Sequence, residues 1–240
     1  MNAVVIEAGW GLGRVVARAL LGDGCTVVLA GPHLDSLSET ADGHARAIVV
    51  PADVSDPAEV DELFASVPGR LDLLVNSMGQ FGPTGTPDEI SVDDWKTTVS
   101  ANLTNAFICA RAAFAAMRRQ RPQGGRIVNI GSISAHVPRP ESIAYTAAKH
   151  AITGLTRSLS LDGRPFNIAC GQIDVGNATR HQTAGVRIRA QQADGSVRSE
   201  PTFDAVYVGA AIRFMASLPL DANAQFLTLA ATTMPYVGRG

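Results

Sequence analysis

The chain has 240 residues, 46% of them hydrophobic, which is enough to bury a full core in one α/β domain, predicted over residues 1–240. A net charge of −2 and a pI near 6.2 give no basic surface for nucleic acid, and no apolar run approaches the roughly 18 residues of a membrane span. We therefore expect a soluble protein that has neither nucleic acid nor membrane as a partner.

Short β-branched runs alternate with helical patterns along the chain, which is typical of βαβ units. The strands are predicted near Ala3–Glu7, Thr26–Ala30, Ala45–Val50, Leu71–Val75, Arg126–Gly131, Asn167–Cys170 and Gln225–Thr228. The longest helices are expected over Val92–Met117 and Ser142–Leu161. This order predicts an α/β fold of the Rossmann type, a doubly wound, seven-stranded parallel sheet with helices on both faces.

The start of the chain and its cysteines indicate the compartment. Residues 1–6 are too short for a signal peptide and lead directly into glycines, so a cytoplasmic location is expected. Cys25, Cys109 and Cys170 are odd in number and lie in apolar sequence, which favours reduced core thiols over disulfides or a metal site. Arg outnumbers Lys 18 to 2, which hints at a GC-rich bacterial genome.

Glycines cluster between the first predicted strand and the next helix. Gly9, Gly11 and Gly13 alternate here with Trp10 and Leu12. Glycines let the backbone turn tightly and approach a pyrophosphate, which rests on the amides at the start of the following helix. The cluster therefore predicts a dinucleotide-binding loop.

Tyr145 and Lys149 lie four residues apart in a predicted helix, which places a phenol beside an ammonium group. The positive charge is expected to lower the pKa of the phenol from about 10 towards neutral pH, where it can act as a general acid. Ser132 ends a predicted buried strand, and ligands of doubly wound sheets bind at such strand ends. Ser132 and Tyr145 are therefore predicted to meet at one substrate oxygen, with Asn102 from the preceding long helix as a further polar group.

This set of Asn, Ser, Tyr and Lys resembles the catalytic tetrad of the short-chain dehydrogenase/reductase family. The resemblance implies that Tyr145 is the general acid/base and that Ser132 binds the substrate oxygen. It also implies that Lys149 lowers the pKa of Tyr145 and holds the nicotinamide ribose, while Asn102 positions a water beside Lys149. The likeness covers nearly the whole chain and extends to a bacterial subset with Gly171-Gln172 after the sixth strand.

The same resemblance assigns residues to nucleotide binding. Besides Tyr145, Lys149 and the loop from Gly9 to Gly13, the positions that it marks are His33, Asp53, Val54, Asn76, Gly79 and Ile173. Asp53 and Val54 match an adenine-contacting pair, and Ile173 is expected near the nicotinamide. The second strand is followed by neither the acidic residue typical of NAD binding nor the Arg typical of NADP binding, and His33 offers a partial positive charge.

Four residues depart from the family pattern, and all map to the nucleotide side: Glu7, Trp10, Pro32 and Met78. The carboxylate of Glu7 replaces a glycine and adds negative charge, and Trp10 adds a large ring. Each is expected to weaken cofactor binding.

Three functions are compatible with these residues. The resemblance implies an NAD(P)(H)-dependent oxidoreductase of the ketoreductase or alcohol dehydrogenase type, which interconverts a carbonyl and an alcohol on a small or secondary-metabolite substrate. NADP(H) is slightly favoured over NAD(H). The alternative is an enzyme that uses no redox cofactor and catalyses a dehydration, cyclisation or isomerisation with Ser132, Tyr145 and Lys149. The third is a non-catalytic scaffold.

Two further features concern the substrate and the assembly. Residues 174–201 lose strand and helix periodicity and are predicted to form a mobile lid, with a partly disordered surface insertion as the alternative. Two roles are open to the flanking residues, contact with an anionic substrate or exposure to solvent; these residues are His136, Arg139, Arg180 and His181. Family members commonly pair their two longest helices, which implies a homotetramer or homodimer.

Overall fold

A central parallel sheet organises the chain, of which the computed structural model describes residues 1–179 and 188–236. Its strands follow the order β11-β6-β5-β4-β1-β2-β3, and every pairing within it is parallel. In chain order they are β1 (Asn2–Ile6), β2 (Thr26–Gly31), β3 (Ala47–Pro51), β4 (Leu73–Asn76), β5 (Gly125–Ser132), β6 (Ile168–Val175) and β11 (Phe226–Leu229). The predicted fold class is confirmed. The strand order reverses between β1 and β4, which places a ligand crevice at their carboxyl ends.

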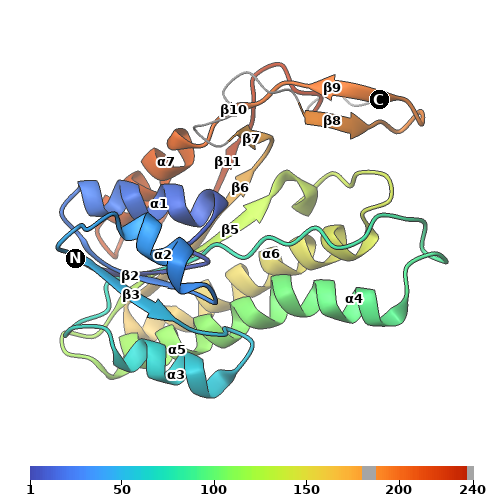
Figure 1. Ribbon diagram of the computed structural model, residues 1–240. Coiled ribbons are helices and arrows are strands. Elements are labelled where there is room, and N and C mark those ends of the chain that lie inside the picture. Colours follow the sequence, from blue (N-terminus) through green and yellow to red (C-terminus); the bar gives the residue numbers. More distant parts are fainter. Residues whose placement is uncertain (180–187, 237–240) are drawn as a thin grey trace.

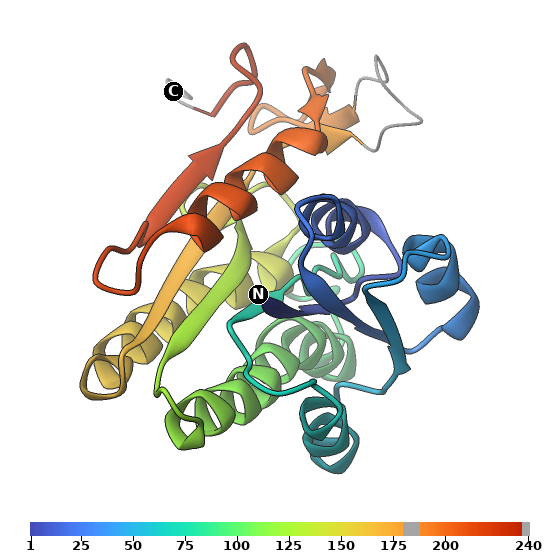
Figure 2. The same ribbon diagram turned by 90° about the vertical axis from the view of Figure 1, so that its left-hand side faces the viewer.

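Helices cover both faces of the sheet (Figures 1 and 2). They are α1 (Gly11–Gly22), α2 (Leu34–Ala41), α3 (Pro57–Ala65), α4 (Val92–Val99), α5 (Asn105–Arg119), α6 (Ile143–Gly163) and α7 (Val206–Ser217). Apolar residues of α1, α2 and α7 pack on one face, and those of α3, α5 and α6 pack on the other. Each central strand is therefore buried on both sides.

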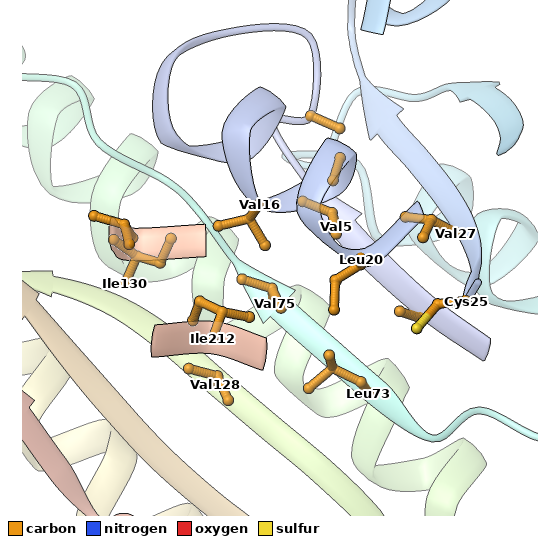
Figure 3. Packing of buried hydrophobic residues seen from close by; sticks show 14 of the residues in the cluster. Val5, Val16, Leu20, Cys25, Val27, Leu73, Val75, Val128, Ile130 and Ile212 are labelled. Carbon is orange, nitrogen blue, oxygen red and sulfur yellow. The ribbon is translucent and has the colours of Figure 1, made fainter. Parts of the chain in front are cut away.

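Alternate residues of β1 show how this core is built. Val5 belongs to the cluster that contains Leu20 of α1 and Ile212 of α7 (Figure 3). Val4 and Ile6 belong to the opposite cluster, with α5. Because both faces are covered, the strand is apolar at every position from Ala3 to Ile6, which is typical of parallel sheets. The three cysteines are buried and free, as predicted.

Two element boundaries differ from the predictions. The helix expected over Val92–Met117 is interrupted by a π-helical segment, η1 (Ser100–Thr104), between α4 and α5. Such segments are rare within α-helices and often lie at functional sites, and Asn102 lies at the centre of this one. Strand β6 continues to Val175, beyond the predicted end at Cys170, because it stays paired with β5 as far as Ser132.

The segment predicted as an irregular lid contains regular structure. Residues 174–175 complete β6, and an antiparallel hairpin follows later, formed by β8 (Ile188–Gln191) and β9 (Val197–Glu200) (Figure 1). Strand β7 (Ala178–Thr179), which precedes the hairpin, pairs with β10 (Phe203–Asp204), which follows it. The prediction that this segment lacks strands is wrong. Arg180 and His181 lie outside the described residues.

Within residues 1–179 and 188–236, no helix is both long and apolar enough to cross a membrane. The same residues contain no group of three or more His, Cys, Asp or Glu side chains placed to hold a metal ion. The assignment of all 240 residues to a single domain stays a prediction.

Candidate active site

A cavity of about 650 Å³ opens at the carboxyl ends of β1, β4, β5 and β6. Cavities of this size hold small molecules and cofactors in proteins. The predicted site residues that line it are Trp10, Gly11, Leu12, Gly79, Ser132, Tyr145 and Lys149. The predicted residues outside its wall are Gly9, Gly13, His33, Asp53, Val54, Asn76, Asn102 and Ile173. The cavity thus joins the glycine loop at one end to the Ser, Tyr and Lys at the other.

Tyr145 lies in the wall of the cavity and is only 6% exposed. Burial raises the pKa of its phenol, while a hydrogen bond with Ser132 and the charge of Arg139 act in the opposite direction. The prediction that a neighbouring ammonium lowers the pKa of Tyr145 is therefore wrong for this structure, because desolvation of the phenolate outweighs the stabilising groups. Phe81, an exposed residue of the loop after β4, stacks on the Tyr145 ring with 4.4 Å between the ring centroids.

Lys149 approaches Tyr145 from the next turn of α6. Its Nζ lies 5.6 Å from the centroid of the Tyr145 ring and donates hydrogen bonds to the backbone oxygens of Met78, at 2.7 Å, and Ile130, at 3.2 Å. Burial lowers the pKa of this ammonium to about 8, although the negative charge of Asp174 opposes the change. Lys149 is thus close to the phenol, but carbonyl oxygens take its hydrogen bonds.

Asn102 does not face the cavity. Its Nδ2 donates to the backbone oxygens of Gln80, at 2.7 Å, and Thr98, at 2.8 Å, and its Oδ1 accepts from the Gln80 amide at 3.1 Å. The side chain therefore fastens the loop after β4 to η1. The water that the family resemblance places between Asn102 and Lys149 stays a prediction.

The glycine loop brings β1 and α1 into close contact. Gly11 has a φ of +48°, and a β-carbon on Gly13 would lie 2.2 Å from the backbone oxygen of Glu7. Helix α1 has no side-chain cap and no acidic residue in its first turn. Its N-terminal amides and the positive end of its dipole are thus open to an anion.

Replacing Gly13 by Ala should destabilise the protein by about 1–3 kcal/mol, because the added methyl group overlaps backbone atoms that cannot rotate away. Gly22→Ala is the matched control in the same helix, since a β-carbon there meets nothing within 4 Å. Denaturant unfolding of the two variants measures the difference. Equal stabilities would contradict the close contact between Gly13 and Glu7.

Glu7 takes the place of a family glycine and has a φ of +57°, in the left-handed region that residues with a β-carbon rarely adopt. It lines the cavity beside the glycine loop. Burial raises the pKa of its carboxyl; the charge of His33 lowers it and that of Asp53 raises it. A half-buried carboxyl thus lies where a dinucleotide would bring negative charge.

The residues expected around the adenosine lie beyond the cavity wall. Val54 is a core residue, and Asp53 is exposed, with its carboxylate accepting hydrogen bonds from the Ser55 amide at 2.9 Å and the Ser55 hydroxyl at 2.7 Å. These bonds lower the pKa of the Asp53 carboxyl. Asn76 is buried and donates to Asn129 Oδ1 at 2.9 Å, so it joins β4 to β5 beneath the cavity. His33 is exposed at the start of α2.

The expected nicotinamide contact at Ile173 is wrong. Ile173 is fully buried in the core cluster with Val5 and Val128, because β6 continues past it. The residues after Ile173 that line the cavity run from Val175 to Thr179. The alternation of polar and apolar residues over Gln172, Ile173, Asp174 and Val175 was the available signal for the longer strand.

Arg139 lines the cavity but already has a partner. Its Nη2 lies 2.6 Å from Glu200 Oε2 on β9, and Asn177 Nδ2 donates to the same oxygen at 2.7 Å. The Glu200 side chain is 1% exposed. The ion pair connects the β8–β9 hairpin to the cavity wall. It also offsets the positive charge of Arg139, which the sequence analysis considered for binding an anionic substrate.

Comparison with known proteins identifies the family. A sequence profile described as short chain dehydrogenase matches residues 1–188. The chain belongs to the short-chain dehydrogenase family. It is similar to a 3beta-hydroxysteroid dehydrogenase of Mediterraneibacter gnavus, with 34% identity over 179 residues, 71% of this chain and 63% of that protein. This relative therefore extends well beyond the matched region.

A second relative matches over more of the chain. The (5R,7aS)-5-hydroxy-7a-methyl-1-oxo-2,3,5,6,7,7a-hexahydro-1H-indene-carboxyl-CoA reductase of Mycobacterium tuberculosis is 32% identical over 225 residues, 89% of this chain and 85% of that protein. Among solved structures, the closed form of serine dehydrogenase complexed with NADP+ has a TM-score of 0.85 at 25% identity, covering 100% of this chain and 98% of the other. The family and these relatives support a dehydrogenase or reductase with a nicotinamide cofactor.

The residues of this short-chain dehydrogenase fit such a cofactor. The uncapped start of α1 and the close contact at Gly13 are suited to a pyrophosphate, and the cavity continues from there to Tyr145 and Lys149. Among the described residues of this wall, Glu7 is the one carboxyl, and its negative charge when ionised opposes an anion.

The sequence analysis missed several residues of the wall, and two of them bear on the site. Phe81 covers the Tyr145 ring, and its signal was an aromatic residue alone in a loop rich in Gly and Pro. Asn105 lines the cavity, and its buried Oδ1 has no hydrogen-bond partner among the described residues. No sequence signal separated Asn105 from other polar residues of the long helix.

Proposed function

We propose that this chain is a nicotinamide-dependent oxidoreductase that interconverts a ring ketone and the corresponding secondary alcohol. The observation that carries the proposal is that Ser132, Tyr145 and Lys149 line one cavity, with Lys149 on the turn of α6 that follows Tyr145. A bound nicotinamide supplies hydride chemistry at the substrate carbon. The residues of the chain manage the oxygen of the substrate.

In the reducing direction Tyr145 donates its phenolic proton to the carbonyl oxygen, while Ser132 donates a hydrogen bond to that oxygen. The proton to be donated is in place at neutral pH, because the pKa of the Tyr145 phenol is raised from a starting value of 10.0. Lys149 stabilises the phenolate that is left behind. In the oxidising direction the same phenolate takes the hydroxyl proton of the alcohol.

The cavity wall and the relatives support a ring substrate. Phe81, Ile133 and Val175 give the end of the cavity near Tyr145 an apolar wall. Both named relatives bear names that place a hydroxyl group on a carbocyclic ring system. These names give no support to the non-redox alternative. NADP(H) is retained as the favoured cofactor, supported by the NADP+ complex of serine dehydrogenase.

Titration with NADPH and NADH, followed by nicotinamide fluorescence, tests the cofactor, and micromolar binding of at least one is expected. Turnover of cyclohexanone and 2-decalone against that of 2-hexanone tests the substrate class. Failure to bind either nucleotide would overturn the redox proposal. Equal turnover of the linear ketone would overturn only the preference for rings.

A further inference from the structure

A buried carboxylate that the proposed reaction does not use lies close to Lys149. Asp174 is on β6, and its side chain is 1% exposed. Its Oδ1 accepts a hydrogen bond from Gln172 Nε2 at 2.7 Å, and its Oδ2 lies 2.7 Å from His136 Nε2. A β-carbon added to Gly131 would lie 2.0 Å from Asp174 Oδ1, so the carboxylate packs directly against the backbone of β5 at Gly131.

Lys149 reaches the same part of β5 from α6. Its Nζ donates to the backbone oxygen of Ile130, the residue that precedes Gly131. Gln172, which donates to Asp174, also donates to Thr153, one turn after Lys149 on α6. The carboxylate and the ammonium group therefore lie in the layer between α6 and strands β5 and β6. Figure 2 shows these two strands beside the helix.

A buried ammonium group requires compensation by negative charge or by dipoles. The hydrogen-bond acceptors of Lys149 are neutral carbonyl oxygens, and no carboxylate forms a direct ion pair with it among the residues that the structure describes. The ionisable groups that face it are Tyr145 on its own helix, Asp174 on β6 and, through Asp174, His136. Of these, only Asp174 carries negative charge, and that charge raises the pKa of Lys149.

We propose that Asp174 is the counter-charge that keeps Lys149 protonated in the closed interior of the site. Asp174 is a positioning residue, since it acts through Lys149 and lies outside the cavity wall. The inference deepens the proposed function and rests on the role given there to Lys149. This role also explains why a carboxylate is found on β6 at the position that pairs with Gly131 of β5.

The chain contains only two lysines, Lys96 and Lys149, which makes a direct test practical. Protein labelled with 13C at the lysine ε-carbon gives two NMR signals, and the exposed Lys96 serves as an internal reference. In Asp174→Asn, which keeps the size of the side chain and removes its charge, the titration midpoint of Lys149 should fall by about one pH unit. Asp174→Ser, smaller and also neutral, carries the same expectation should Asp174→Asn not fold.

Two controls separate charge from other effects. Asp162→Asn removes an exposed carboxylate about 20 Å further along α6 and should leave the Lys149 midpoint unchanged. His136→Ala removes the hydrogen bond to Asp174 while keeping the carboxylate, and should move the midpoint far less than Asp174→Asn does. An unchanged midpoint in Asp174→Asn would overturn the proposal, and so would an equally large shift in His136→Ala. No nucleotide or substrate is needed, so the result is independent of whether the proposed reaction occurs.

Discussion

Tyr145→Phe should lower kcat/KM for ketone reduction by about 10²–10⁴-fold, because it removes the only atom proposed to donate a proton to the substrate oxygen. The ring that stacks on Phe81 is retained, so the packing of the site should survive. Steady-state kinetics at saturating nucleotide measure the loss. The nucleotide dissociation constant, from fluorescence, should change little.

Tyr207→Phe is the matched control for this substitution. Tyr207 is 60% exposed on α7, which packs on the opposite face of the sheet from α6. The same loss of a phenolic oxygen there should leave turnover unaltered. If Tyr145→Phe kept more than a tenth of the wild-type kcat/KM while Tyr207→Phe behaved normally, Tyr145 could not be the main proton donor.

The fold could be predicted from the sequence because its signals are local. Apolar strands such as Val4–Ile6, each followed by a helical pattern, leave few arrangements other than a parallel sheet with two helical layers. Strand ends were less predictable, since they depend on pairing with a neighbour. Strand β6 extends to Val175 because β5 continues beside it to Ser132, and one sequence does not show that pairing.

The relative positions of Tyr145 and Lys149 could be predicted from the sequence, but their electrostatics could not. A spacing of four residues was enough to place Tyr145 and Lys149 near each other, since helix geometry fixes that relation. The pKa of Tyr145 depends instead on burial and on groups from other elements, among them Ser132 and Arg139. The partners of Asn102, in the loop after β4, likewise become visible only once the chain is folded.

Glu7→Gln should stabilise the protein at neutral pH and lose this advantage as the pH falls. The folded-state pKa of Glu7 is raised, so the ionised carboxyl destabilises the fold; that cost grows as the pH rises from about 4.5 through the folded pKa. Below about 4.5 the acid is protonated in both states, and the two proteins should differ little in this term. Denaturant unfolding from pH 4 to pH 8 measures the difference, and a gain that is constant with pH would contradict a raised pKa of the Glu7 carboxyl.

Glu7→Gly should raise the affinity for NADPH by about tenfold, because two charges roughly 10 Å apart near a protein surface interact by between 1 and 2 kcal/mol. The gain for NADH should be smaller, since NADH lacks the additional phosphate.

Glycine also relieves the positive φ of this residue, so Glu7→Gly should be more stable than Glu7→Gln by about 1 kcal/mol at every pH. The two variants therefore separate charge from backbone strain. A gain in affinity in Glu7→Gly alone would assign the effect to the backbone of the glycine loop; a gain in both would assign it to the carboxylate. Unchanged affinity in both would mean that the dinucleotide binds away from Glu7, and that this departure from the family pattern leaves the cofactor site intact.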